Sequence, residues 1–253
     1  MNRSSAVIRC STGYRSRFAE SPATSRRRCS ATGAFLLLNA GQEFIESRHG
    51  LITTLGTATS PARPEYVLEG SVFMAGAIMQ WLRDGLGILP DVRQAADISA
   101  SIPNTGGVCL IPAFTGLGAP YWKSDARAAI TGVTRGTTQR EIIRAAEEAI
   151  AFQCADLIEA MRRDLDRPIR KVRVDGGAAR DRFLLQFQAD LLNSTIERPD
   201  YLETTLLGAA RLASDATAEC RAPKMTFTPH MAEAERNNHL TRWHQAVNTI
   251  IKD

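Results

Sequence analysis

The sequence has no long hydrophobic run and few residues that bind metals or form disulfides. Its longest apolar stretch, residues 71–82, is shorter than the ~20 residues that cross a bilayer. The five cysteines are odd in number, scattered and never spaced as Cys-x-x-Cys, which excludes a disulfide scaffold and a zinc site and favours a reducing compartment. The four histidines do not cluster with cysteines or carboxylates. We therefore expect no metal ligands and no role in a membrane.

Acidic residues are nearly absent from residues 1–30, which contain seven arginines, seven serines and one acid, Glu20. This leader has a net charge of +6, which leaves −2 for the rest of a chain of net charge +4. The net positive charge of the whole chain therefore does not indicate a nucleic-acid partner, because it comes from the leader. The composition is typical of a mitochondrial targeting segment, with a disordered arm or translated sequence foreign to the fold as alternatives. We expect a cytoplasmic protein, or a mitochondrial one if the leader is a transit segment.

The pattern changes near residue 32. Short strand-like runs at residues 33–39, 51–55 and 66–69, separated by Gly, Ser, Asn and Pro, predict an antiparallel meander. Residues 71–81 would place apolar side chains on almost every face of a helix, which predicts a buried helix. Gly76 and Gln80 share one face of it, and a glycine inside a helix costs about 1 kcal/mol relative to alanine. We expect a ligand or a neighbouring helix to pack there.

The second half predicts an α/β layer. A short strand at residues 108–114 and a long structured loop to residue 136 precede a helix at residues 138–164, with a core stripe every three or four residues. The stripe contains Ile142, Ala146, Ile150, Cys154, Leu157 and Met161. Strands at 172–175 and 195–197 then alternate with helices at 181–193, 204–217 and within 238–252, as in an α/β layer.

Residues 170–194 read as a buried strand, a tight Asp175-Gly176-Gly177-Ala178 turn and an amphipathic helix. Two adjacent glycines let a flat or anionic group approach the main chain, and the helix directs unpaired N–H groups at it. This predicts nucleotide binding. The alternative is that the glycines only close a strand-to-helix connection.

From Thr32 onward the chain resembles the C-terminal, ATP-binding domain of the glycerol kinases, within the FGGY carbohydrate kinases of the actin-like ATPase superfamily. The resemblance covers about nine tenths of the chain. Its motifs are Pro-Ala-Phe-Thr-Gly-Leu-Gly-Ala-Pro-Tyr-Trp at 112–122, Thr-Gly-Val-Thr-Arg-Gly at 131–136, Glu-Gly-Ser-Val-Phe-Met-Ala-Gly-Ala at 69–77 and Val-Asp-Gly-Gly-Ala at 174–178. It implies an α/β fold of the actin-like (ribonuclease H-like) class, a mixed sheet flanked by helices, over residues 31–253.

The resemblance also implies the site. Thr32 and Gly33 would cradle the distal phosphates of ATP, and Phe35 would pack on the carbon side of glycerol. The other residues implied to bind ATP are Gly76, Gln80, Gly176, Gly177 and Asp181. The reaction would be in-line transfer of the γ-phosphoryl group to the 3-hydroxyl of glycerol, with Mg²⁺ bridging phosphate oxygens.

Departures from the family pattern set limits on this function. Asp181 stands where the family has asparagine, Ala31 replaces a glycine of the phosphate loop, and Glu147 occupies a normally apolar helix position. The N-terminal domain that holds glycerol, and the Gly-Asp-Gln-Gln segment that supplies the catalytic base, have no counterpart, so no catalytic residue is identified. We hypothesise that the leader is out-of-frame or wrongly started translation fused to a genuine domain.

Three functions follow from the sequence. The first is a glycerol kinase polypeptide that carries only the nucleotide-binding half and binds ATP with little turnover. The second is a non-catalytic nucleotide-binding fragment that pairs with a separate N-terminal partner, and the third is a degenerate remnant of a kinase. Glycerol is the expected substrate, a homo-oligomer or the missing N-terminal domain the expected protein partner, and no nucleic acid is expected.

Overall fold

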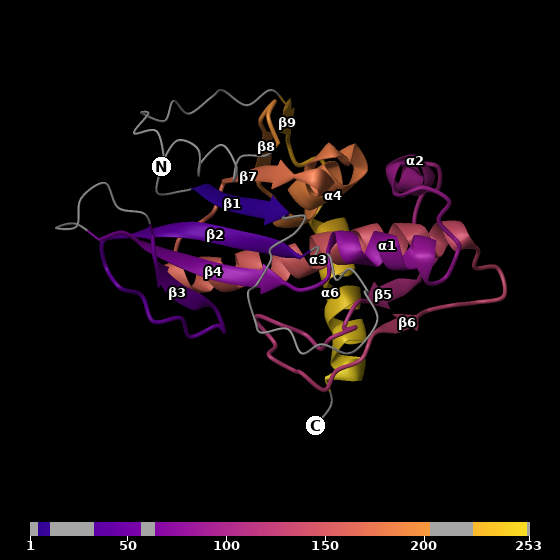
Figure 1. Cartoon of the computed structure of the whole chain (residues 1–253), viewed down its shortest axis with the longest axis horizontal. Coiled ribbons are helices and arrows are strands. Elements are labelled where there is room, and N and C mark those ends of the chain that lie inside the picture. The colour runs from indigo at the N-terminus through magenta and orange to yellow at the C-terminus, as the bar shows by residue number, and fades with distance from the viewer. Residues whose placement is uncertain (1–4, 11–32, 57–63, 203–224, 252–253) are drawn as a thin grey trace, which may run out of the picture.

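The computed structural model describes residues 5–10, 33–56, 64–202 and 225–251. A seven-stranded mixed sheet crosses the described part of the molecule, with helices packed beside it (Figure 1). Its strands, in order across the sheet, are β3 (Ile52–Leu55), β4 (Tyr66–Val72), β2 (Ala34–Gly41), β1 (Ser5–Cys10), β7 (Lys171–Gly176), β8 (Thr195–Arg198) and β9 (Met225–Phe227). A small separate sheet joins β5 (Cys109–Ile111) to β6 (Ala129–Thr131).

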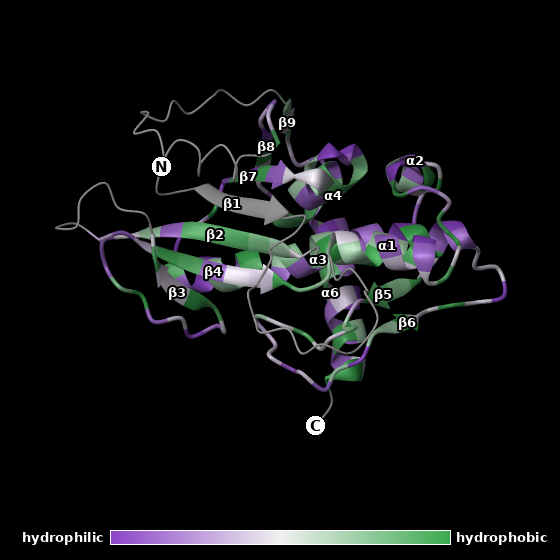
Figure 2. Ribbon diagram, viewed as in Figure 1, coloured by the Kyte–Doolittle hydropathy of each residue, from purple (hydrophilic) through white to green (hydrophobic). Residues whose placement is uncertain are grey.

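The predicted meander is confirmed, because β2, β3 and β4 pair antiparallel. Along β2 the residues alternate: Ala34, Leu36 and Leu38 are buried, whereas Phe35 and Leu37 are partly exposed on the other face. This period of two shows that only one face of β2 packs on the core. Figure 2 shows hydrophobic colour along much of β2 and β4.

Residues 5–10 correct one expectation about the leader. The leader has no sustained periodicity that would predict a helix or strand, yet residues 5–10 form β1, which pairs antiparallel with β2 and parallel with β7. Without β1, the N–H and C=O groups of β2 and β7 would lack strand partners at the centre of the sheet, and the run Ala6-Val7-Ile8 has the residue types that favour strands. The domain boundary expected at residue 30 stays a prediction, because residues 11–30 lie outside the described residues.

The helices are α1 (Gly76–Asp84), α2 (Ala95–Ala100), α3 (Gln139–Leu165), α4 (Arg182–Leu192) and α6 (Glu233–Ile250), with short 3₁₀ turns η1 (Val92–Gln94) and η2 (Gly177–Arg180). The helix expected at 71–81 begins later than predicted, because the chain continues as β4 to Val72. It is also not buried all round, since Gln80 and Trp81 are partly exposed. The predicted helix at 204–217 lies outside the described residues.

Helix α3 organises the core. It contacts α1, α2, α4, β2, β4 and β5, and Figure 1 shows it running behind β2 and β4. It begins with a capping box in which Thr138 Oγ1 accepts from Arg140 N and the Glu141 carboxylate accepts from Thr138 N. Of the predicted stripe, all but Ile142 are buried, and several other α3 residues are buried too. Three of them are acidic, Glu147, Glu148 and Asp156, which the stripe alone would place outside the core.

The strands β6 and β9 and the helix α2 were not predicted. Each is only 3 to 6 residues long, and such short elements carry too few residues for a periodic pattern. Helix α2 matters for function because it packs against α3 and α4 beside the cavity described next.

Candidate functional site

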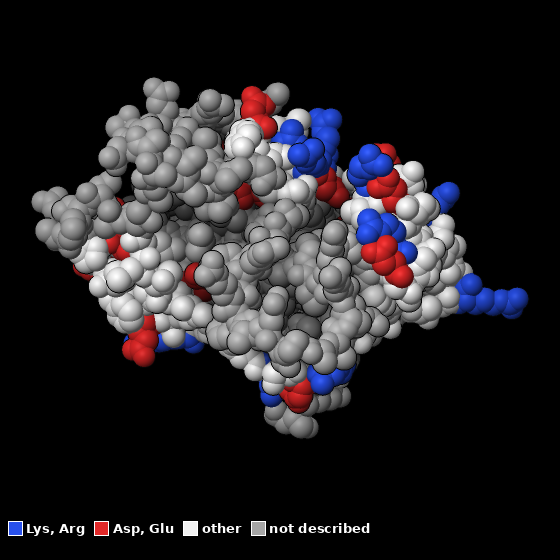
Figure 3. Space-filling view, in the orientation of Figure 1, with Lys and Arg blue, Asp and Glu red and all other residues white. Residues whose placement is uncertain are grey.

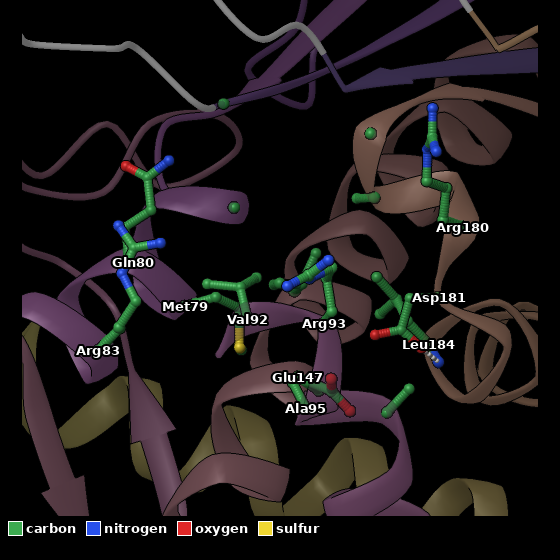
Figure 4. Close-up of a pocket in the computed structure, with 16 residues that line it drawn as sticks. Met79, Gln80, Arg83, Val92, Arg93, Ala95, Glu147, Arg180, Asp181 and Leu184 are labelled. Atoms are coloured by element: carbon green, nitrogen blue, oxygen red, sulfur yellow. Dashed lines mark hydrogen bonds between the residues drawn. The ribbon is translucent and has the colours of Figure 1, made fainter. Parts of the chain in front are cut away.

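A cavity of about 440 Å³ lies between α1, η1, α2, α3, η2 and α4 (Figure 4). The elements that enclose it are separated by roughly a hundred residues of chain and meet because α3 packs against α1, α2 and α4. Figure 4 shows Gln80 and Arg83 of α1 on one side and Asp181 and Leu184 of α4 on the other. A cavity of this volume is in the range of small-molecule sites, about 300 to 1,000 Å³.

Most of the predicted nucleotide residues come together here. Gly33, Gly76, Gln80, Gly177 and Asp181 all line the cavity. Gly176 lies next to them at the end of β7 but is not part of the lining. Phe35 does not line it either, because it lies on the face of β2 opposite to the buried Ala34 and Leu36. Thr32 lies outside the described residues.

Local geometry explains two of the glycines at this site. A Cβ at Gly33 would meet the carbonyl oxygen of Val72 at 2.7 Å, so the start of β2 can approach β4 only without a side chain. Gly176 has φ 84°, in the left-handed region that favours glycine, and it turns the end of β7 into η2. Both glycines therefore have a structural reason that does not depend on a ligand.

Asp181 begins α4. Its carboxylate accepts a hydrogen bond of 2.8 Å from Leu184 N, as the N-cap of the helix. The first turn of α4 therefore faces the cavity together with η2 and Gly177. A helix start of this kind attracts polar or negative ligand groups.

The two broad walls of the cavity are aliphatic. Met79, Val92, Ile150 and Leu184 line it from α1, η1, α3 and α4. A flat aromatic ligand gains free energy between such walls because its faces leave water. The sequence did not assign these residues to the site, since apolar side chains are equally explained by core packing.

The charged residues around the cavity are largely paired. Arg83 donates to Asp84 at 2.6 and 2.7 Å, and Arg93 forms an ion pair of 2.5 Å with Asp91. In Figure 3, blue and red groups lie side by side on the surface near α1 and α2. In each pair the acid neutralises the arginine beside it, so the positive charge at this edge of the cavity is weak.

Glu147 is the exception. It lines the cavity from α3 with an exposed fraction of 1%, and neither carboxyl oxygen has a hydrogen-bond partner among the described residues. Burial, followed by the negative charge of Asp181, raises the pKa of Glu147 from 4.5 to about 9. The sequence marked Glu147 as an anomaly in an apolar position but did not predict that it lines the site.

The described residues contain no group of three His, Cys, Asp or Glu side chains that could hold a metal ion. Among the helices that the structure describes, none is long and apolar enough to span a bilayer.

Comparison with known proteins gives the family. The FGGY family of carbohydrate kinases, C-terminal domain, matches residues 29–217. The chain is 50% identical over 226 residues to a glycerol kinase of Dechloromonas aromatica, and 48% identical over 230 residues to one of Desulfitobacterium hafniense. These alignments cover 85% and 87% of the chain but 45% and 46% of the relatives. The chain thus spans less than half the length of the curated relatives that it matches.

Solved structures agree with the sequence comparison. The structure is similar to that of Plasmodium falciparum glycerol kinase with ADP, with a TM-score of 0.83, 32% identity, and coverage of 98% of this chain and 47% of that one. A xylulose kinase from Brucella ovis matches with a TM-score of 0.75 at 16% identity, which shows the fold alone. The predicted α/β, actin-like fold class is confirmed. This chain belongs to the FGGY family of carbohydrate kinases and corresponds to its C-terminal domain.

Proposed function

We propose that this chain binds ATP in the cavity between α1, α3 and α4 and is the nucleotide-binding part of a kinase that phosphorylates glycerol. The observation that carries the proposal is the convergence of Gly33, Gly76, Gln80, Gly177 and Asp181 on one cavity. The sequence predicts these residues as nucleotide ligands, and they lie at four separate places in the fold: the start of β2, helix α1, the turn η2 and the start of α4.

The chemistry of the cavity supports this assignment. The purine would lie between the aliphatic walls, with its polar edge toward α3 and the start of α4. The backbone of the η2 turn, with Gly177, would approach the ribose, because no side chain of Gly177 stands in the way. The phosphates would extend toward Gly33 at the start of β2.

The glycerol assignment comes from the relatives. Several proteins that are 48 to 50% identical to this chain over the aligned residues are named glycerol kinases, and one solved relative is a glycerol kinase with ADP. Phe35, on the free face of β2, would pack on the carbon side of glycerol. The attacking 3-hydroxyl would form a bond to the γ-phosphorus, ADP would leave, and the hydroxyl proton would pass to a base outside the residues described.

Mg²⁺ would enter with the nucleotide. When bound, it would neutralise charge on the phosphates, and it commonly keeps several waters instead of a full set of protein ligands. A homo-oligomeric state and a cytoplasmic location stay predictions.

A matched pair of leucine substitutions tests the nucleotide site. Gly76→Leu places a side chain in the cavity, whereas Ala100→Leu adds the same group at an exposed end of α2 that does not line it. We expect Gly76→Leu to weaken Mg-ATP binding by at least about tenfold in isothermal titration and Ala100→Leu to leave it unchanged. Equal affinities of the two variants would contradict the assignment of the cavity.

A second experiment tests the kinase activity. We expect no glycerol-dependent ADP release from this chain alone, and restored release when it is co-expressed with the N-terminal half of the Dechloromonas aromatica glycerol kinase. ATP binding without restored turnover would instead support a non-catalytic nucleotide-binding fragment. Glycerol-dependent turnover by the chain alone would contradict the expectation that the catalytic base lies elsewhere.

A further inference from the structure

Glu147 has a hydrogen-bonding capacity that the described protein does not use. It lies in the middle of α3, its side chain is buried, and it lines the cavity with both carboxyl oxygens unpartnered among the described residues. A buried polar group without a partner is unfavourable for folding, and such groups are retained mainly where they serve a function. A ligand in the cavity is the partner that could satisfy it.

Two polar side chains, Asp181 and Ser99, lie close enough to the Glu147 carboxyl group to interact with it, although neither makes a hydrogen bond of good geometry to its oxygens. Arg144, one turn earlier on α3, donates to Glu148 at 2.8 Å and to the carbonyl oxygens of Ser99 and Ile102. Asp181 is an acceptor, and one of its oxygens already accepts from Leu184 N. The Ser99 hydroxyl is also buried without a partner among the described residues.

The environment keeps Glu147 neutral at pH 7. Burial raises its pKa to about 9, and the carboxylate of Asp181 acts in the same direction. Asp181 and Arg144 are the charged groups that act on Glu147, and Arg83, Arg93 and Arg180 line the cavity with it. A neutral carboxyl presents one O–H donor beside one C=O acceptor.

Adenine offers the complement of that pair. Its edge carries a ring nitrogen that accepts a hydrogen bond next to an amino group that donates one. We propose that Glu147 is a specificity-determining residue of the nucleotide cavity and pairs with the 6-amino group and adjacent ring nitrogen of adenine. This inference rests on the proposed function, because it assumes that the purine enters this cavity.

The test compares two nucleotides that differ only in the 6-amino group: ADP and the 5′-diphosphate of unsubstituted purine riboside. Their affinities for the wild-type chain and for Glu147→Leu, Glu147→Gln and Glu159→Gln are measured by isothermal titration at pH 7. Glu159 is the matched control, because it is an exposed glutamate on the same helix and does not line the cavity.

We expect the wild-type chain and Glu159→Gln to prefer ADP by about tenfold, as one good base-edge pair provides. Glu147→Leu should lose this preference, because leucine offers no hydrogen bond. Glu147→Gln should keep most of it, because a side-chain amide presents a donor beside an acceptor in the same place. Melting temperatures of all four proteins show whether they are folded.

A pH series gives a second readout. Only the protonated carboxyl can donate, so ADP affinity of the wild-type chain should fall by about tenfold between pH 7 and pH 10, one unit above the pKa of about 9. Glu147→Gln should show no such fall, because an amide does not titrate.

The outcomes distinguish failure of the inference about Glu147 from failure of the proposed nucleotide-binding function. If a folded Glu147→Leu variant keeps the wild-type preference for ADP, the inference is wrong while nucleotide binding stands. If the wild-type chain binds neither nucleotide, the proposed function fails and the inference fails with it.

Discussion

Two buried acids on α3, Asp156 and Glu147, lie nine residues apart and have opposite surroundings. Asp156 accepts hydrogen bonds from Tyr121 Oη at 2.8 Å and Trp243 Nε1 at 2.7 Å, and contacts His244 Nε2 at 2.9 Å. Glu147 has no hydrogen-bond partner among the described residues and faces the cavity. The two acids are almost equally buried, with exposed fractions of 8% and 1%.

The difference separates an acid whose partners come from the fold from an acid that faces a cavity. Asp156, on α3, bonds to Tyr121 in the loop before β6 and to Trp243 and His244 on α6. These partners, which the fold itself supplies, compensate the charge of the buried carboxylate. The carboxyl oxygens of Glu147 make no hydrogen bond of good geometry to a described side chain, and the negative charge of Asp181 disfavours its ionised form. Burial alone therefore does not reveal the role of a charged residue, whereas its hydrogen-bond partners do.

The largest expected effect is at Asp156. Asp156→Ala leaves the Tyr121 hydroxyl, the Trp243 indole N–H and His244 without their acceptor, and removal of one member of a buried charged network costs about 3 to 5 kcal/mol. We expect this loss in the free energy of unfolding measured with urea. Asp156→Asn, which keeps one acceptor oxygen, should lose less; equal losses would show that the carboxylate charge, not the hydrogen bonding, stabilises this junction.

Substitution of Glu147 is expected to raise the free energy of unfolding instead of lowering it. Glu147→Leu removes an unpaired buried polar group and should raise the free energy of unfolding by about 1 to 3 kcal/mol. The folded pKa of about 9 lies above the unfolded value of 4.5, so the unfolded chain loses this proton first as pH rises. The free energy of unfolding of the wild-type chain therefore falls as pH rises from 4.5 to about 9, by the part that depends on protonation of Glu147.

The gain from Glu147→Leu should accordingly be larger at pH 8 than at pH 5. Urea unfolding of both proteins at the two pH values measures it. A gain that does not change with pH would show that Glu147 has an ordinary pKa in the folded chain.

A smaller effect is expected at His244. Its hydrogen bond with Asp156 raises its pKa above 6.5, so its stabilising contribution is complete below pH 6.5 and is lost as pH rises through the folded value. Because the side chain is half exposed, the difference in stability between the wild-type chain and His244→Gln should stay below about 1 kcal/mol. It should be larger at pH 5.5 than at pH 8.5; the reverse order would contradict the ion pair.

The smallest effect is expected at Glu159. It lies on the same helix but is exposed, with ion pairs of 3.2 Å to Arg163 and 3.7 Å to Arg162. Exposed pairs of this kind contribute little, so Glu159→Gln should change the free energy of unfolding by less than about 0.5 kcal/mol. A larger loss would mean that acids on α3 stabilise the fold even without burial.

Prediction from sequence succeeded where a pattern repeats over several residues. The meander of β2, β3 and β4 and the long helix α3 follow from alternation and from the three-to-four-residue period. It was wrong about residues 5–10, because a strand at the centre of a sheet depends on two distant neighbours, β2 and β7, that no local pattern records. The short elements α2, β6 and β9 were missed for lack of a pattern.

The same division holds for the site. Gly76, Gln80, Gly177 and Asp181 could be selected from the sequence, since glycine turns and family motifs are local. That Phe35 lies on the opposite face of β2 from the core depended on the register of the strand in the folded sheet.

By itself the sequence determined the family, the meander and the glycine-rich residues that line the cavity, because each depends on residues close together in the chain. Only the tertiary structure decided which acids on α3 are satisfied. Asp156 gains partners from two segments, one 35 residues earlier and one 87 residues later, whereas Glu147 meets Asp181 and an open cavity. The physical reason is that hydrogen-bond satisfaction depends on distances in space, which the fold sets and the sequence order does not.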